Sequence, residues 1–157
     1  MKGADLDEIE ALYRARFHAF VRTAAAVAGD VDSGREAVQE GFATAVRKRS
    51  TYRGEGSLEA WVWPIVLNEA RDRLRRRTPA VPVASEPTDE REAKDEELRL
   101  ALAALPERQR LVAFLRYYAD LEYEGIASVL GIAPGTVAAT LNAAHAALRE
   151  RLEGVPS

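Results

Sequence analysis

Apolar residues recur every three or four positions in two runs near the start of the chain, separated by the Gly-Asp pair at 29–30. This spacing predicts two amphipathic helices. Asp5 or Asp7 can cap the first helix, and Asp32 or Ser33 the second. The apolar positions are Leu6, Ile9, Tyr13, Phe17, Phe20, Ala24 and Val27 in the first run, and Val38, Phe42, Ala45 and Val46 in the second. The opposite face of the second helix is polar, and is either solvated or a docking surface.

A loop with two glycines interrupts this periodicity at 50–57, and the pattern resumes after Ser57 in a third helix that is expected to run to about Arg77. Ser57 can cap this helix, because a serine hydroxyl accepts a hydrogen bond from a free amide of the first turn. Trp61 and Trp63 both fall in the helix but cannot both lie on its buried stripe. We therefore expect one indole to remain partly accessible.

Residues 78–89 contain three prolines and no helical pattern, which predicts an extended linker between two domains. A helix is then expected from about Asp89 to Leu105, and Pro106 opens another that reaches Asp120. The side chains expected to be buried in these two helices are Leu98, Ala101, Leu102 and Leu105, and Leu111, Val112, Phe114, Leu115 and Tyr118.

The stretch 121–148 has the pattern of a helix-turn-helix. Ile126 recurs at helical spacing with the apolar residues that follow it, and Gly131 can supply the positive φ that ends this helix. Pro134 suits the start of a second helix, whose apolar stripe includes Leu141. The alternative is an ordinary helical hairpin in an all-α core.

The expected fold class is all-α, with two small helical domains joined by a proline-rich acidic linker, the C-terminal one a helix-turn-helix domain. Residues 1–78 are assigned to the N-terminal domain, residues 79–94 to the linker and residues 95–157 to the C-terminal domain. Hydrophobic residues make up 47% of the chain, which is ample for a buried core and excludes disorder over the whole length.

The composition argues against several kinds of site. The chain has no cysteine and only two histidines, His18 and His145, so we expect no disulfide, metal site or cofactor. It offers no paired carboxylates in a cleft-like context, no metal constellation and no nucleophile motif, so we expect no catalytic residues and no enzyme activity. The acidic N-terminus is unlike a signal peptide, and no apolar run approaches the length of a membrane span. We expect a soluble cytoplasmic protein with no membrane partner.

Basic charge is concentrated in an otherwise acidic chain, whose formal net charge is −3. Residues 1–78 hold 14 Lys and Arg against 12 Asp and Glu, whereas residues 79–97 hold 2 against 7. The cations gather at 47–53 and 71–77, a pattern that suggests a polyanionic partner. The alternative is that the second cluster only balances the partial negative charge at the end of a helix.

The second helix of the helix-turn-helix is unusual for a helix that reads DNA. From Thr136 to Leu148 it contains no Lys, Arg, Asp or Glu, and only His145 can become cationic. Attraction to phosphate supplies most non-specific DNA affinity, and Arg or Lys makes the commonest specific contact to guanine. The charge pattern therefore argues against tight DNA binding by this helix alone.

A series of short strings runs in a fixed order on both sides of the proline-rich segment. The strings are Val38-Gln39-Glu40 with Phe42, Tyr52-Arg53-Gly54-Glu55-Gly56-Ser57-Leu58, Ala60-Trp61, Asn68, Asp72-Arg73-Leu74-Arg75-Arg76-Arg77, Ala104-Leu105-Pro106-Glu107-Arg108-Gln109-Arg110, Leu115-Arg116-Tyr117-Tyr118, Tyr123-Glu124, Ile126-Ala127, Leu130-Gly131-Ile132 and Gly135-Thr136-Val137. Together they resemble, over nearly the whole chain, the small two-domain extracytoplasmic-function (ECF) sigma factors of bacterial RNA polymerase.

The resemblance implies one polymerase-binding surface and two promoter-binding surfaces. Core RNA polymerase would be bound by Glu36, Gln39, Glu40 and Arg47. The minus-ten element would be opened and held by Arg53, Ser57, Trp61, Asn68, Arg71, Arg75 and Arg76. The minus-thirty-five element would be bound by Thr136, Thr140, Asn142, His145 and Arg149. The implied partners are core RNA polymerase, promoter DNA and, as a further partner, an anti-sigma factor.

The chain departs from this family in the last helix, where members usually carry basic and polar residues. The corresponding positions are Ala138, Ala139, Thr140, Ala143 and His145. Two functions stay open from the sequence. One is a sigma factor whose uncharged helix reads the minus-thirty-five element through short side chains and contacts to thymine methyls. The other is a sigma-like regulator that binds polymerase or another protein without reading that element.

Overall fold

The first helix begins and ends at capping residues that the sequence supplies. The computed structural model describes residues 3–76 and 90–153. Helix α1 (Leu6–Ala28) follows Asp5, whose carboxylate accepts a backbone N–H two residues on at 3.3 Å. It ends at Gly29, whose φ of 103° lies in the left-handed region that favours glycine. Both ends therefore fall where the sequence pattern placed them.

Helix α2 (Val31–Arg47) starts earlier than expected. Its N-cap is Asp30, whose carboxylate accepts the backbone N–H of Ser33 at 2.7 Å and the hydroxyl of the same residue at 2.9 Å. The expected caps, Asp32 and Ser33, consequently lie inside the first turn. The physical reason is that the carboxylate of Asp30 reaches the third helical amide, which is the position an N-cap side chain satisfies.

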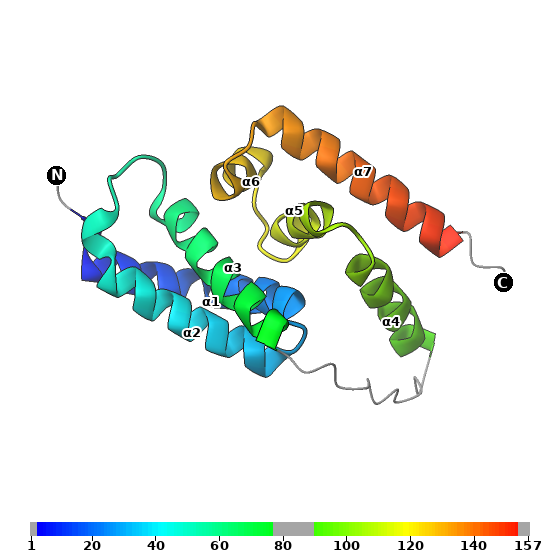
Figure 1. Ribbon diagram of the computed structural model, residues 1–157, viewed down its shortest axis with the longest axis horizontal. Helices are drawn as coiled ribbons and strands as arrows, with labels where there is room; N and C mark the ends of the chain where they lie inside the picture. Colours follow the sequence, from blue (N-terminus) through cyan, green and yellow to red (C-terminus); the bar gives the residue numbers. More distant parts are fainter. Residues whose placement is uncertain (1–2, 77–89, 154–157) are drawn as a thin grey trace.

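The loop after α2 contains a single 3₁₀ turn, η1 (Arg49–Thr51), and leads into α3 (Leu58–Arg76). Ser57 caps α3 as predicted, because its Oγ accepts the backbone N–H of Ala60 at 3.0 Å. Helices α1, α2 and α3 pack against one another and form the N-terminal half of the molecule (Figure 1).

An aromatic cluster forms the centre of these three helices. Trp63 is fully buried and stacks on Phe20, with the ring centroids 4.0 Å apart. Phe42 meets Phe20 edge-on at 5.0 Å. Trp61, in contrast, is only half-buried. The expectation that one of the two indoles stays accessible is therefore confirmed.

The C-terminal half contains four helices: α4 (Glu90–Ala103), α5 (Glu107–Tyr117), α6 (Tyr123–Leu130) and α7 (Pro134–Glu153). Residues 77–89, which hold most of the predicted linker, lie outside the described residues. Residues 90–94, which were also assigned to the linker, are helical. The described residues are helical and contain no strand, so the all-α fold class is confirmed.

Helix α4 buries fewer side chains than expected. Ala101 and Leu105 are buried, but Leu98 is 41% exposed and Leu102 is only partly buried. The expectation that Leu98 is enclosed is therefore wrong. The reason is that the main packing partner of α4 is a single helix, α7, so one face of α4 is left without a neighbour.

Helices α6 and α7 form the helix-turn-helix. Gly131 ends α6 with a φ of 68°, and the N–H of Ile132 donates to the carbonyl of Ala127 at 3.1 Å. The two helices are inclined by 102°, which lies in the range typical of this motif. Within the described chain, no single helix is both long and apolar enough to cross a membrane, and α6 and α7 reach that length and apolarity only as this bent pair.

The two halves of the chain are in contact. Helix α5 packs on α1 and α6 on α3 (Figure 1). The guanidinium of Arg22 donates to the carbonyl of Tyr118 at 2.9 Å. Arg16 donates to the carbonyl of Ala119 and also pairs with Glu59 at 3.2 Å. Two arginines of α1 therefore hold the turn that follows α5.

Candidate nucleic-acid interface

Four polar side chains share the outer face of α2. Glu36, Gln39, Glu40 and Arg47 are exposed and are spaced by three, four and seven residues, intervals that repeat on one side of a helix. Arg47 lies 3.4 Å from Glu40, and Glu36 lies 3.6 Å from Arg73. Exposed ion pairs of this kind are weak, so the side chains can exchange them for contacts with a partner.

An aromatic pair lies beside the glycine loop that precedes α3. The rings of Tyr52 and Trp61 are 5.5 Å apart, and the Tyr52 hydroxyl donates to the carbonyl of Gly56 at 2.7 Å. Both rings are half-buried, so each keeps an accessible surface on which a base can stack. Arg53 is exposed in the same loop, whereas Ser57 already uses its Oγ as the helix cap.

Asn68 and Arg71 lie one turn apart on α3 and contact each other. Asn68 is exposed, and its Oδ1 accepts a long hydrogen bond from Nη1 of Arg71 at 3.4 Å. Nε of Arg71 lies 3.0 Å from Oε1 of Glu107, which belongs to the C-terminal half. This second contact is an ion pair without hydrogen-bond geometry, since Nε finds no hydrogen-bond acceptor. The structure therefore brings an amide and a guanidinium together, with a carboxylate already placed on the guanidinium.

Carboxylates also neutralise the arginines at the end of α3. Arg75 and Arg76 both pair with Asp72, at 3.6 and 2.7 Å. Arg73 pairs with Glu69 at 2.8 Å. Each described arginine of the cluster thus has a carboxylate beside it, although Arg75 and Arg76 share one. The remaining attraction of the cluster for a polyanion is weaker than the arginine count indicates, although Arg75 and Arg76 are exposed and can leave Asp72 for a phosphate.

Short, uncharged side chains occupy the outer face of α7 over residues 136–146. The buried side is formed by Val137 and Leu141, with Ala144 one turn further on. The opposite side carries exposed residues, and these are Thr136, Ala139, Asn142, Ala143 and Ala146. Such a face offers methyl groups, one hydroxyl and one amide to the edges of bases.

The predicted residues of α7 do not all share this face. At 100° per residue, Thr140 and His145 are separated by about 140° around the helix axis, and both are half-buried. His145 is directed to α5, where its Nε2 lies 2.5 Å from the hydroxyl of Tyr117. Thr136 and Asn142 are exposed on the outer side, and Arg149 is exposed further along the helix. Thr136 and Asn142 are consequently the best-placed polar groups for base contacts.

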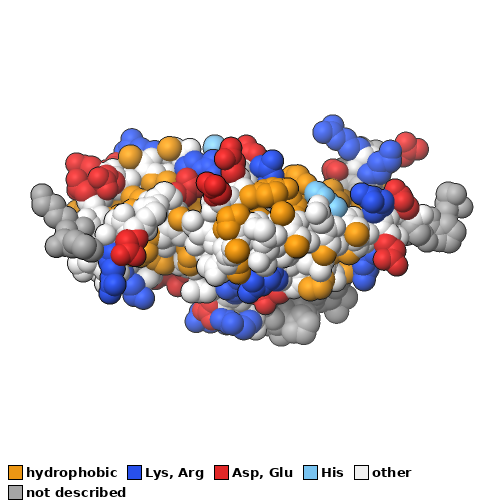
Figure 2. Space-filling model, turned by 90° about the horizontal axis from the view of Figure 1, so that it is seen from above, with side chains coloured by type: hydrophobic (Ala, Val, Ile, Leu, Met, Phe, Trp, Pro, Cys, Tyr) orange, Lys and Arg blue, Asp and Glu red, His pale blue; other side chains and the backbone are white. Residues whose placement is uncertain are grey.

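Charges of both signs lie side by side on the face drawn in Figure 2, with hydrophobic side chains between them. No continuous basic surface covers that face.

Among the described residues, no group of three His, Cys, Asp or Glu side chains is placed to hold a metal ion.

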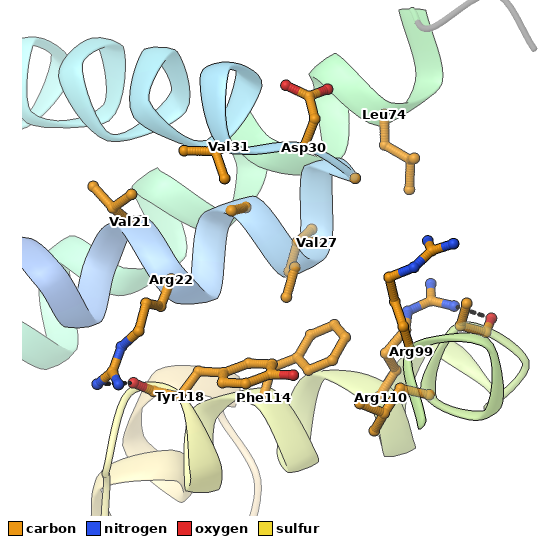
Figure 3. Close-up of a pocket in the computed structure, with 15 residues that line it drawn as sticks. Val21, Arg22, Val27, Asp30, Val31, Leu74, Arg99, Arg110, Phe114 and Tyr118 are labelled. Carbon is orange, nitrogen blue, oxygen red and sulfur yellow. Dashed lines mark hydrogen bonds between the residues drawn. The ribbon is translucent and has the colours of Figure 1, made fainter. Parts of the chain in front are cut away.

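A cavity of about 720 Å³ opens between the two halves of the chain (Figure 3). Val27 of α1 and Phe114 of α5 face each other across it, and Leu74, from the end of α3, lies near its edge. Its charged lining residues are Arg22, Arg99, Arg110 and Asp30. The lining is therefore mostly apolar, with three cations and one carboxylate.

The two halves match two family models in the order that the fold presents them. The Sigma-70 region 2 model matches residues 12–79, and the Sigma-70 region 4 model matches residues 95–148. The chain belongs to the sigma-70 family. It is an RNA polymerase sigma factor of the ECF group and directs promoter-specific transcription initiation, with core polymerase and promoter DNA as partners. Sigma factors are initiation factors and not enzymes, in agreement with the sequence prediction.

Known sigma factors resemble this one over most of its length. The RNA polymerase sigma factor SigV of Bacillus subtilis is 29% identical over 139 residues, which cover 85% of this chain and 84% of SigV. The ECF sigma factor EcfG of Rhodopseudomonas palustris is 29% identical, covering 80% of this chain and 74% of EcfG. The fold matches that of the sigma factor RpoE of Bartonella quintana, solved with the anti-sigma factor NepR, with a TM-score of 0.73, 22% identity and coverage of 96% of this chain and 100% of RpoE.

Sequence reasoning missed several residues of this sigma factor's candidate surfaces. Tyr52 was one, although an aromatic residue directly before the Arg-Gly-Glu-Gly loop is a readable signal for a stacking platform. Glu107 and Tyr117 left no such signal. Their partners, Arg71 and His145, lie 36 and 28 residues away in the chain, and only the fold brings the pairs together.

Proposed function

We propose that residues 1–78 and residues 95–157 of this sigma factor form two domains with separate binding functions. The first binds core polymerase through the outer face of α2 and the minus-ten element through α3 and the loop before it. The second binds the minus-thirty-five element through α7. The observation that carries this proposal is the grouping of an aromatic pair, an exposed amide and a guanidinium along α3, beside a separate polar stripe on α2.

The chemistry of the α3 surface supports recognition of single-stranded bases. A flipped or unstacked base needs a flat surface to stack on and polar groups that can bind its edge. Trp61 supplies an accessible indole and Asn68 an exposed amide. Arg53, Arg75 and Arg76 are exposed and can follow the phosphate backbone, where they add affinity without reading sequence.

The α7 surface supports a different kind of contact. Asn142 can bind an adenine edge, Thr136 can donate or accept a hydrogen bond, and Ala139 and Ala143 can touch thymine methyl groups. These contacts bring almost no phosphate attraction, so the domain contributes to promoter choice only when polymerase holds it beside the DNA. Tethering raises the effective concentration of DNA at α7 and replaces the missing affinity.

The test is transcription by core polymerase and the full chain from a promoter library randomised at both elements. Asn68→Ala should flatten the preference at the minus-ten element, and Asn142→Ala the preference at the minus-thirty-five element. Each variant is the matched control for the other, because both remove the same exposed amide from a helix surface. A uniform loss of transcripts over all promoters with Asn68→Ala would place that residue in a structural role. An unchanged preference at the minus-thirty-five element with Asn142→Ala would show that Asn142 does not recognise bases there.

We also propose that this sigma factor acts in the cytoplasm and that its partners include an anti-sigma factor. The cavity between the two halves is apolar and bordered by arginines, which suits a helix with an apolar face and acidic flanks. Val31 and Leu74 line it and are 54% and 41% exposed. An anti-sigma factor seated there should be displaced by core polymerase and should lose affinity for a Val31→Asp chain. Equal binding to the wild type and to Val31→Asp would show that the partner uses another surface.

A further inference from the structure

Helix α5 crosses the N-terminal half with both of its ends tied to it. At its C-terminal end, Arg22 donates to the carbonyl of Tyr118 and Arg16 to the carbonyl of Ala119. At its N-terminal end, Glu107 is the first helical residue, and its carboxylate lies 3.0 Å from Nε of Arg71 on α3. The tie at the first end consists of charge-assisted hydrogen bonds to backbone carbonyls, whereas the tie at the second end is a bare ion pair.

The Arg71 end of α5 coincides with the candidate minus-ten surface. Arg71 touches Asn68, the exposed amide of that surface, through Nη1. A carboxylate and a phosphate oxygen bind a guanidinium in the same way, as anionic hydrogen-bond acceptors. A guanidinium that carries a carboxylate must release it, at least in part, before it can neutralise a backbone phosphate.

We propose that Glu107 is an internal competitor of the promoter backbone at Arg71. In the free chain its carboxylate occupies the place that a phosphate of the minus-ten strand would take. Binding of the strand then breaks the ion pair that ties the N-terminal end of α5 to α3, so DNA engagement favours separation of the two halves of the chain. This inference rests on the proposed role of Arg71 in minus-ten binding.

The exposure of the two side chains determines how strongly Glu107 competes with a phosphate for Arg71. The side chain of Glu107 is 60% exposed and that of Arg71 is 31% exposed, so water and salt screen the pair. An exposed pair of this kind weakens a competing ligand by about two- to fivefold. Glu107 therefore weakens binding of the strand at Arg71 without abolishing it, and polymerase and DNA can displace its carboxylate.

The experiment uses the full chain and a fluorescent thymidine strand of about twenty residues, which probes the backbone without a promoter sequence. Glu107→Gln keeps the shape of the side chain and removes its charge. At low salt we expect it to bind the strand about two- to fivefold more tightly than the wild type, with the gain shrinking as salt rises. Glu150→Gln is the matched control: it removes one exposed carboxylate from the far end of α7 and should change the affinity by much less.

A double-mutant cycle locates the effect at Arg71. Arg71→Gln alone should weaken binding, and Glu107→Gln added to it should give no further gain, because the competed cation is gone. The inference is overturned if Glu107→Gln binds like the wild type, if Glu150→Gln gains as much, or if the gain persists without Arg71. Undetectable binding of the strand by Glu107→Gln at low salt also overturns it, since a released Arg71 then offers no DNA affinity.

Two further measurements separate this inference from the proposed function. The chain has no cysteine, so Asp32→Cys and Glu150→Cys allow a donor and an acceptor dye to be placed on α2 and α7. Adding the thymidine strand should lower energy transfer between them, and unchanged transfer would refute the coupling to domain separation. Failure of the wild-type chain to support transcription from any promoter in the library would instead refute the proposed function. Normal transcription with no effect of Glu107 would refute only the competitor.

Discussion

Replacing Gly34 by alanine should destabilise the N-terminal half, because the backbone of α1 lies directly against this glycine of α2. An added Cβ would lie 2.6 Å from both the Cα and the N atom of Ala25. These are backbone atoms within a helix, so the two helices must move apart to relieve the clash. Overpacking costs about 1–3 kcal/mol, whereas exchanging glycine for alanine within a helix gains roughly 0.5–1 kcal/mol. Because the clash is with backbone atoms, its cost falls in the upper half of that range, and we expect a net loss of about 1–2 kcal/mol.

Urea denaturation followed by tryptophan fluorescence measures this loss, since Trp61 and Trp63 both lie in α3, within the N-terminal half. With a slope of about 2 kcal/mol per molar urea, the middle of the usual range, the midpoint should fall by roughly 0.5–1 M. Gly135→Ala is the control, because a Cβ there meets nothing within 4 Å and the residue lies in the other half. It should leave the fluorescence midpoint unchanged. A Gly34→Ala chain as stable as the wild type would refute the claim that the α1 backbone sets this approach.

Two further predictions concern charge. Arg99 hydrogen-bonds the carboxyl of Glu96 and lowers its pKa, so this pair contributes stability above the ordinary carboxyl pKa that is lost as the pH falls through the lowered one. Arg99→Gln should return the Glu96 pKa towards its ordinary value in an NMR titration, and an unmoved pKa would contradict that cause. Changing Arg75 and Arg76 together to alanine should make the dependence of single-strand affinity on salt less steep. The decrease should be smaller than the loss of two phosphate contacts would cause, because both arginines already pair with Asp72. A reduction by two full contacts would mean that DNA strips both arginines from that carboxylate.

Local patterns predicted most of the helices because their signals lie within a few residues of each other. The Ser57 cap, the end of α1 at Gly29 and the turn at Gly131 all depend on a side chain and amides one turn away. The start of α2 was predicted two or three residues too late, because several neighbouring residues could each serve as its N-cap. Three capping residues lie within four positions, and the sequence does not reveal that Asp30 is the one that reaches the third helical amide.

Contacts between the halves could not be predicted in this way. Arg16 and Arg22 read as two cations on the polar side of α1, but in the fold they donate to backbone carbonyls at the end of α5. A backbone carbonyl has no identity in the sequence, so no pattern points to it. The pairing of Arg76 with Asp72 was readable from its four-residue spacing, whereas that of Arg71 with Glu107 was not.

The pairing of arginines with carboxylates on α3 bears on how this sigma factor selects promoters. Phosphate contacts strengthen binding to every DNA sequence alike, so they raise affinity without raising discrimination. In this chain carboxylates hold Arg71, Arg75 and Arg76, and no charged residue lies between 136 and 148. Non-specific binding of the free protein should therefore be low. If the proposed surfaces bind the promoter, promoter choice should depend on the polar and methyl contacts that polymerase brings within reach, and these contacts should set the ratio of specific to non-specific binding.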